Sequence, residues 1–197
     1  IMKKLLLLAS FMLFGMASLF AQVELKALAG MNFSTFHNTD TDVSAKAGYQ
    51  FGAGVLIGNK FYVEPGIQFV RSSKVITPEM TNPTAGSSEI DFNQNLVKIP
   101  VYAGYHILGA EDKPFALRVF AGPTVSIPGK ITKGEDQIGK DNIKSAIWAI
   151  DGGLGFDFLF LFVEANYEYS LNDYFVEDIS KAKHGAFIIN AGVHIDF

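Results

Sequence analysis

The chain has 197 residues, of which 49% are hydrophobic and 18% are charged, and this composition suits one folded domain and argues against disorder. It contains no cysteine, which excludes disulfides, thiolate metal sites and attachment of lipid to an N-terminal cysteine. The formal charge is −4, and the Lys and Arg residues are scattered along the chain, so we expect no nucleic-acid partner.

The first element in chain order is an apolar N-terminal segment. Two lysines precede an apolar run over residues 5–20, and Ala21 and Gln22 follow it. A basic start, a short apolar run and a small residue are typical of a secretory signal peptide, whereas a membrane-spanning helix needs about 20 apolar residues. We therefore expect residues 1–21 to be a signal peptide that is cleaved between Ala21 and Gln22. Residues 22–197 are then one exported domain.

The rest of the chain alternates apolar and polar residues and lacks the 3.6-residue period of helices. Eight segments alternate in this way, each close to or somewhat above the 9–11 residues that a tilted strand needs to cross a membrane. They are residues 23–36, 47–57, 61–71, 90–107, 115–127, 144–157, 159–171 and 185–197. An even number of antiparallel strands can close into a barrel.

The connections between these segments alternate in length. Three short ones follow the second, fourth and sixth segments, namely residues 58–60, residues 109–114 and a turn near Phe158. Four long ones follow the other segments, namely residues 37–45, 72–89, 128–143 and 172–184. Short turns at one end and long loops at the other are typical of outer-membrane barrels with periplasmic termini. The sequence therefore predicts an all-β, eight-stranded antiparallel up-and-down transmembrane β-barrel, with a soluble antiparallel barrel or sandwich as the alternative.

The two faces of the predicted strands differ in polarity. One register is apolar and free of charge, as at Val63, Val119 and Val163. The other register is rich in glycine and carries Gln50, Glu64, Gln68, Lys98, His106, Arg118, Asp151, Asp157, Glu164, Asn166, Glu168 and His194. A narrow barrel needs small residues inside and an apolar band against lipid. We therefore expect the polar register to line the lumen, and aromatic residues near strand ends, such as Trp148, to lie at the membrane interfaces.

Five segments resemble a known family: "NLVKIPVYAGYHI" (95–107), "FALRVFAGPTVS" (115–126), "WAIDGGLGFDF" (148–158), "LFVEANYEYSLNDY" (161–174) and "NAGVHIDF" (190–197). They are similar to the β-barrel outer-membrane domain family of Bacteroidota, often labelled porin-family or PorT-like. The resemblance covers nearly all of residues 22–197 and implies a barrel in the bacterial outer membrane. The family has no shared catalytic residue or ligand that could be carried over.

The last of these segments also matches the assembly signal of outer-membrane proteins. Its members are Gly192, Val193, Ile195 and the aromatic Phe197. The expected partners are accordingly outer-membrane lipid and the barrel-assembly machinery. An extracellular or envelope protein that binds the outer loops is a further candidate partner.

Charged residues of the inward register form the candidate site. Glu64, Arg118 and Glu164 each lie about four residues beyond a short turn, so we expect them at similar height in the lumen. Lys98 and Asp151 complete the predicted lumen charge network, with Arg118 as the cation shared by the two glutamates. The network could be a plug of paired charges or a relay for protons or ions. We favour the plug, because buried charges must be paired in either case and Tyr62, Tyr102, Phe120 and one of Phe160 and Phe162 should also fill the lumen.

Other candidate sites have less support. Two loop clusters could hold a cation but lack the ligand count and the glycine of a calcium loop: His37, Asp40 and Asp42, and Glu135, Asp136 and Asp141. His184 near Ser170 or Ser180 could form a hydrolytic dyad, yet no third orienting group is spaced to complete it. We therefore expect no catalytic, metal or cofactor site.

The leading functional hypothesis is a non-enzymatic outer-membrane barrel with a plugged, charged lumen and long outer loops, in a structural or binding role. The alternatives are a small pore for ions or solutes, a barrel lipid hydrolase and a soluble lipocalin-like carrier.

Overall fold

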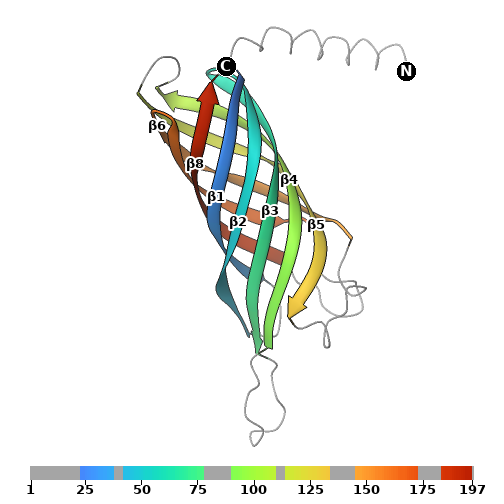
Figure 1. The fold of residues 1–197 in the computed structure, drawn as a ribbon. Helices are drawn as coiled ribbons and strands as arrows, with labels where there is room; N and C mark the ends of the chain where they lie inside the picture. The colour runs from blue at the N-terminus through green and yellow to red at the C-terminus, as the bar shows by residue number, and fades with distance from the viewer. Residues whose placement is uncertain are drawn as a thin grey trace, which may run out of the picture.

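The computed structural model describes residues 23–37, 42–77, 90–109, 114–133, 145–172 and 183–196. They form eight antiparallel strands: β1 (Val23–His37), β2 (Asp42–Gly58), β3 (Phe61–Thr77), β4 (Ile90–Leu108), β5 (Phe115–Lys133), β6 (Ile147–Phe158), β7 (Leu161–Ser170) and β8 (Lys183–Asp196). Each strand pairs with the next, and β8 pairs with β1, so the sheet closes into the predicted barrel (Figure 1). Within these ranges no helix is long and apolar enough to cross a membrane.

Several strands extend further toward the long connections than we predicted, whereas β6 begins at Ile147, three residues later than the predicted residue 144, and β7 ends one residue early at Ser170. β2 begins at Asp42, five residues early, while β3 continues to Thr77 and β5 continues to Lys133. These extensions contain polar residues, so their side chains give little apolar alternation. Backbone pairing extends them nonetheless, as where Asp42 lies opposite Thr77. The long connections are correspondingly shorter than the sequence suggested.

The turn between β6 and β7 consists of Leu159 and Phe160, so β7 begins two residues later than predicted. Leu159 has a φ of 55°, in the left-handed region that leucine seldom adopts. Its N–H donates to the carbonyl of Pro114 at 2.8 Å, and the carbonyl of Phe160 accepts from the N–H of His194 at 2.9 Å. This turn leaves Phe160 61% exposed and Phe162 only 2% exposed, so Phe162 is the ring that fills the lumen.

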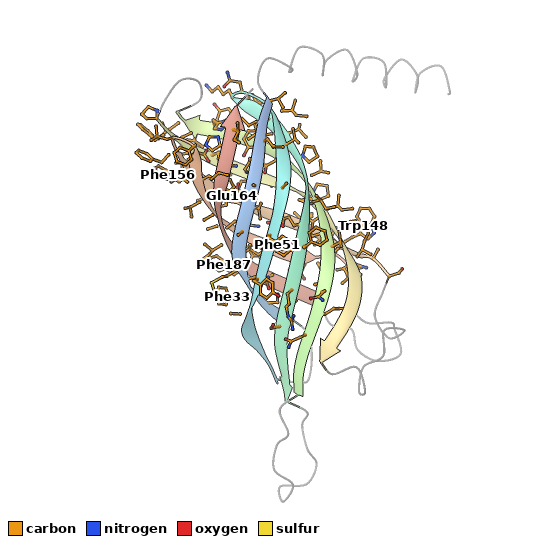
Figure 2. The ribbon with its side chains drawn as sticks, viewed as in Figure 1. Phe33, Phe51, Trp148, Phe156, Glu164 and Phe187 are labelled. Carbon is orange, nitrogen blue, oxygen red and sulfur yellow. The ribbon has the colours of Figure 1, made fainter. Side chains whose placement is uncertain are left out.

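The predicted assignment of the two registers is confirmed. Exposed apolar side chains cover the wall, and Figure 2 shows Phe33, Phe51, Trp148, Phe156 and Phe187 on its outside. The polar residues assigned to the lumen are buried, except that His194 is partly exposed at the end of the short turns. An apolar belt around a closed wall needs hydrocarbon rather than water outside it, which disagrees with a soluble carrier.

Glycines make room for the rings inside the barrel. The ring of Tyr62 lies directly over Gly104, and the ring of Phe162 lies over Gly192, so a Cβ at either glycine would overlap the ring. Tyr62 also packs with Leu56, Tyr102 and Phe120 in a buried cluster. Aromatic side chains therefore fill the part of the lumen next to this cluster.

Candidate functional site

Four strands run from the end of the short turns toward the end of the long connections, namely β1, β3, β5 and β7. The fourth residue of each is charged, and in this order the residues are Lys26, Glu64, Arg118 and Glu164. All four side chains point into the lumen and are at most 5% exposed. Because the four strands start at the same end, these residues lie at one level and form a ring in which positive and negative charges alternate.

Lys26 lies between the two glutamates of this ring. Its Nζ donates to Oε1 of Glu64 at 2.7 Å and to Oε1 of Glu164 at 2.6 Å. Its ammonium group also lies 4.5 Å from the centroid of the Phe162 ring. Charge-assisted hydrogen bonds of this length are among the stronger ones in proteins. Lys26 therefore joins β1 to β3 on one side and to β7 on the other.

Arg118 is the second cation of the ring and binds three carboxylates. Its Nε lies 2.8 and 3.0 Å from the two carboxylate oxygens of Asp157. Its Nη2 lies 2.8 Å from Oε1 of Glu164, and its Nη1 lies 3.6 Å from Oε2 of Glu64. We call these five residues, Lys26, Glu64, Arg118, Asp157 and Glu164, the Lys26 network.

A second set of buried polar residues lies further toward the long connections. We call it the Asp151 network, which consists of Lys98, Tyr102, Thr124, Asp151, Asn166 and Glu168. Glu168 lies four residues beyond Glu164 on β7, and Lys98 pairs with it at 2.7 Å. Asp151 is hydrogen-bonded by neutral groups. Its Oδ2 accepts from the hydroxyl of Tyr102, and both of its carboxylate oxygens accept from the amide of Asn166, all at 2.7–2.8 Å. Thr124 donates to Glu168 at 3.1 Å.

Carboxylates outnumber cations in both networks. The Lys26 network holds three carboxylates and two cations, and the Asp151 network holds two carboxylates and one cation. Each network therefore has one formal negative charge that no cation within it balances. Hydrogen bonds from neutral donors can stabilise such a charge, as Tyr102 and Asn166 do at Asp151.

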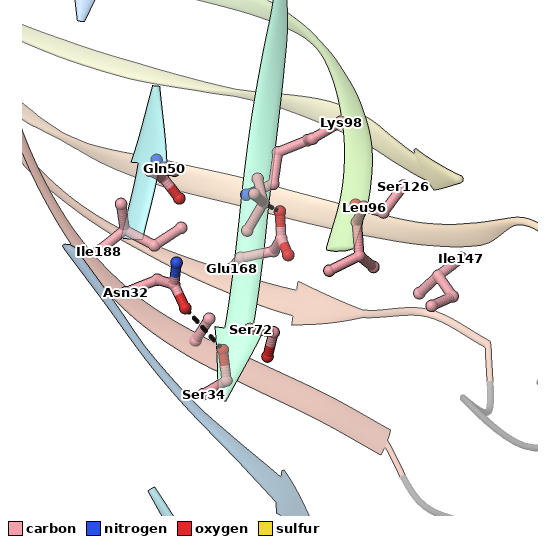
Figure 3. Close-up of a pocket in the computed structure, with 12 residues that line it drawn as sticks. Asn32, Ser34, Gln50, Ser72, Leu96, Lys98, Ser126, Ile147, Glu168 and Ile188 are labelled. Atoms are coloured by element: carbon pink, nitrogen blue, oxygen red, sulfur yellow. Dashed lines mark hydrogen bonds and ion pairs between the residues drawn. The ribbon is translucent and has the colours of Figure 1, made fainter. Parts of the chain in front are cut away.

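A small cavity with a mixed polar and apolar lining continues the lumen beyond the Asp151 network (Figure 3). Its polar lining comes from Asn32, Ser34, Gln50, Ser72, Lys98, Ser126 and Glu168, and its apolar lining from Val70, Leu96, Ile147, Ala186 and Ile188. Its volume of about 20 Å³ is enough for about one water molecule. The part of the lumen that the structure describes thus offers space for single waters here rather than for a hydrated solute.

The structure brings together three of the five residues that the sequence pointed to. Glu64, Arg118 and Glu164 meet as predicted, and Arg118 is indeed shared by the two glutamates, although Lys26 holds them more closely. Lys98 and Asp151 belong to the second network instead. Lys26 was not predicted, because the height of each charged residue in the lumen was taken from its distance to a preceding short turn, and no short turn precedes β1. Counting four residues from the predicted start at residue 23 would have found it.

The structure describes the predicted assembly signal only in part and does not describe the predicted cleavage site. Gly192, Val193 and Ile195 lie in β8, with both apolar side chains on the outer face. Phe197 and the expected cleavage site at Ala21 and Gln22 lie outside the described residues, so the assembly signal and the signal peptide stay predictions.

Most residues of the predicted cation sites and of the candidate hydrolytic dyad lie outside the residues whose side chains the structure describes. The side chains of His37, Asp40, Asp42, Glu135, Asp136 and Asp141 fall outside the described set, as do those of Ser180 and His184. Ser170 is buried at the end of β7. Among the described residues, no group of three or more His, Asp or Glu side chains is arranged to hold a metal ion.

Comparisons with known proteins agree with this architecture. A family model described as outer membrane protein beta-barrel domain matches residues 20–176. The solved structure of the outer membrane protein OprG from Pseudomonas aeruginosa is 11% identical, has a TM-score of 0.56, and the match covers 89% of this chain and 95% of that one. The attachment invasion locus protein Ail of Yersinia pestis is 14% identical, with a TM-score of 0.48 and coverage of 87% and 98%. Neisserial surface protein A is 12% identical, with a TM-score of 0.48 and coverage of 87% and 96%.

The OprG match establishes a shared fold and nothing about shared chemistry. The search of curated protein sequences gives no match.

Proposed function

Because the chain belongs to the outer membrane protein β-barrel domain family, we propose that it is a non-enzymatic barrel of the bacterial outer membrane with a plugged lumen. The short turns and both termini lie on the periplasmic side, and the long connections face outward. Outer-membrane lipid and the barrel-assembly machinery are its general partners. Its specific role is structural, or it binds an extracellular or envelope protein through the long connections.

The ring of alternating charges carries the proposal of a plug. Its ion pairs run across the lumen between strands that are not neighbours, from β1 to β3, from β1 to β7 and from β5 to β7. The Phe162 ring packs against both cations, 4.5 Å from Lys26 Nζ and 5.5 Å from the Arg118 guanidinium carbon. Eight strands enclose an interior that side chains can fill. A solute could pass this level only if several buried ion pairs separated.

The excess of carboxylates favours one second candidate, a narrow path for cations. One unbalanced negative charge in each network would attract cations from either side. This candidate requires that the ion pairs of the Lys26 network open often enough to let an ion pass.

Planar-bilayer conductance separates the two candidates. We expect the wild-type barrel to give no steady conductance. The double substitution Lys26→Ala with Glu164→Ala removes one cation and one anion from the same level, and we expect it to produce steady conductance because it opens the lumen without changing net charge. The matched control is Lys60→Ala with Glu24→Ala, at the mouth of the barrel, which should stay closed. Steady, cation-selective conductance of the wild type would show that the lumen is a path for cations and not a plug.

A further inference from the structure

The outer wall carries a groove that the lumen networks do not explain. It lies across β2, β3 and β4 and reaches Gly129 on β5. Its main side chains are Tyr49, Phe51, Phe69, Arg71 and Val97. The groove encloses about 300 Å³, which is at the lower limit of the roughly 300–1,000 Å³ of small-molecule sites. It faces the surroundings of the barrel and not its interior.

Two rows of side chains form the groove. The apolar row contains Phe51, Phe69 and Val97, which lie opposite one another on adjacent strands. The rings of Phe51 and Phe69 stack with centroids 5.5 Å apart. The second row lies two residues closer to the long connections and contains Tyr49, Arg71 and Asn95 in the same order of strands. The groove is thus apolar on one side and polar on the other.

Small residues and an irregular ladder make the hollow. Val97 is much smaller than the neighbouring Phe69, and Gly129 has no side chain to fill the space beside Asn95. The pairing of β4 with β5 shifts between Gln94 and Leu96, next to this point. A Cβ at Gly129 would lie 3.1 Å from the carbonyl oxygen of Asn95, so the backbones approach closely there.

Arg71 is the feature that selects a ligand. Its side chain is in the outward register of β3 and only partly exposed, and none of the ion pairs between described residues involves it. An arginine on a lipid-facing wall is costly unless its guanidinium reaches an anion or the headgroup region. The guanidinium can also form two parallel hydrogen bonds with a phosphate. The position at the polar side of the groove matches the headgroup level of a bilayer whose chains cover Phe51 and Phe69.

We propose that this groove is a specific binding site for a membrane lipid with an anionic phosphate headgroup, in the leaflet at the long-connection end. Arg71 binds the phosphate, Tyr49 and Asn95 flank it, and an acyl chain lies along Phe51, Phe69 and Val97. The site goes beyond the proposed function, because it lies on the outer wall and is independent of whether the lumen conducts.

Native mass spectrometry of the folded barrel tests the site. The protein is released from detergent micelles that contain equal amounts of phosphatidylglycerol and phosphatidylcholine with identical chains, and the lipid that stays bound is counted. We expect wild-type protein to retain phosphatidylglycerol about fivefold more than phosphatidylcholine, which corresponds to about 1 kcal/mol for one basic side chain. Glycerol phosphate without chains should not displace the retained lipid, because the groove binds the chain as well.

Four variants locate the binding. Arg71→Gln should abolish the preference, and Arg71→Lys should keep most of it because the charge remains. Val97→Phe should reduce retention of phosphatidylglycerol although Arg71 is intact, because the ring fills the groove. Lys60→Gln is the matched control, since Lys60 is also a cation beside an aromatic ring of the wall, 5.6 Å from Tyr105, but at the opposite end. It should behave as the wild type.

Each alternative outcome overturns the proposal. Equal retention of the two lipids by the wild type, or an unchanged preference in Arg71→Gln, would show that the groove does not select an anion. If Lys60→Gln lost the preference for phosphatidylglycerol as much as Arg71→Gln, any surface cation would be enough to produce that preference. Displacement by glycerol phosphate, or full retention in Val97→Phe, would show that the headgroup binds without the groove. Only variants that keep the heat-modifiable gel mobility of a folded barrel are compared.

Discussion

The inner face of β7 carries Glu164, Asn166 and Glu168, whereas the outer face of the same ten residues carries Leu161, Val163 and Tyr167. The inner side chains are buried in the sense that no solvent reaches them, yet they are the polar ones. The outer side chains are the accessible ones, yet they are apolar. In a soluble protein the two sets would be exchanged.

The difference shows that available partners, and not burial, decide where this fold places charge. Within the lumen each carboxylate of β7 meets a cation from another strand, Lys26 and Arg118 at Glu164 and Lys98 at Glu168. On the outer face the hydrocarbon offers no partner, so a charge there would remain unpaired. Removing a partner inside and adding a charge outside should therefore have similar costs.

The largest effect is expected inside, at Arg118. The substitution Arg118→Met leaves Glu64, Asp157 and Glu164 around Lys26 alone. We expect it to lower the free energy of unfolding by about 3–5 kcal/mol, the usual result of breaking a buried ion pair. Urea unfolding of the barrel in lipid vesicles measures the change.

A compensated variant serves as the control for Arg118→Met. Adding Asp157→Asn and Glu164→Gln leaves Lys26 and Glu64 as a balanced pair, and more than half of the lost free energy should return. A cost below about 1 kcal/mol for the single substitution would mean that water or ions screen the lumen charges.

The second effect is expected outside, at the middle of β7. Ala165→Arg places a charge in the hydrocarbon and should cost about 2–4 kcal/mol, whereas Leu161→Arg at the end of the strand should cost about 0–1 kcal/mol. The same unfolding measurement compares the two variants. Equal costs, or a larger cost at Leu161, would show that the apolar band does not centre on Ala165.

The smallest effect concerns a neutral donor inside. Tyr102→Phe removes one hydrogen bond to Asp151 and leaves the two contacts from Asn166, so we expect a cost of about 1.5–3 kcal/mol. Tyr105→Phe, on the outer face of the same strand, is the matched control and should change stability by no more than about 0.5 kcal/mol. If both substitutions have the same effect, the hydroxyl of Tyr102 does not stabilise the Asp151 carboxylate.

Most of the fold could be predicted because the side-chain period of two fixes which face each residue joins. Val63, Val119 and Val163 were placed outside and Glu64, Arg118 and Glu164 inside on that basis alone. The equal distance of the three charged residues from a preceding short turn predicted their common height. The period of two could not decide between Phe160 and Phe162 as the lumen ring, because the period does not say where a turn ends, and the turn at Leu159 and Phe160 decides for Phe162.

The partners within the lumen could not be predicted in the same way. A strand pattern gives the face and approximate height of a residue but not the direction of a long side chain across the barrel. Lys98 reaches Glu168 rather than forming a direct ion pair with Asp151, and Asp157 turns toward Arg118. The strand ends beyond Arg71 and Ile127 were missed for a different reason, because backbone pairing continues there without apolar alternation.

The contact of Lys26 with Glu164 bears on how the barrel forms. The two residues are 138 positions apart, and β8 lies between their strands in the closed sheet. The ammonium and the carboxylate can therefore meet only after β8 has docked on both β1 and β7. Until then Lys26 can pair only with Glu64, and Glu164 only with Arg118. A slip of one residue would turn either charge toward lipid. This one ion pair, between Lys26 and Glu164, thus adds its free energy only to a fully closed barrel in correct register, which favours cooperative closure and penalises misregistered assembly intermediates.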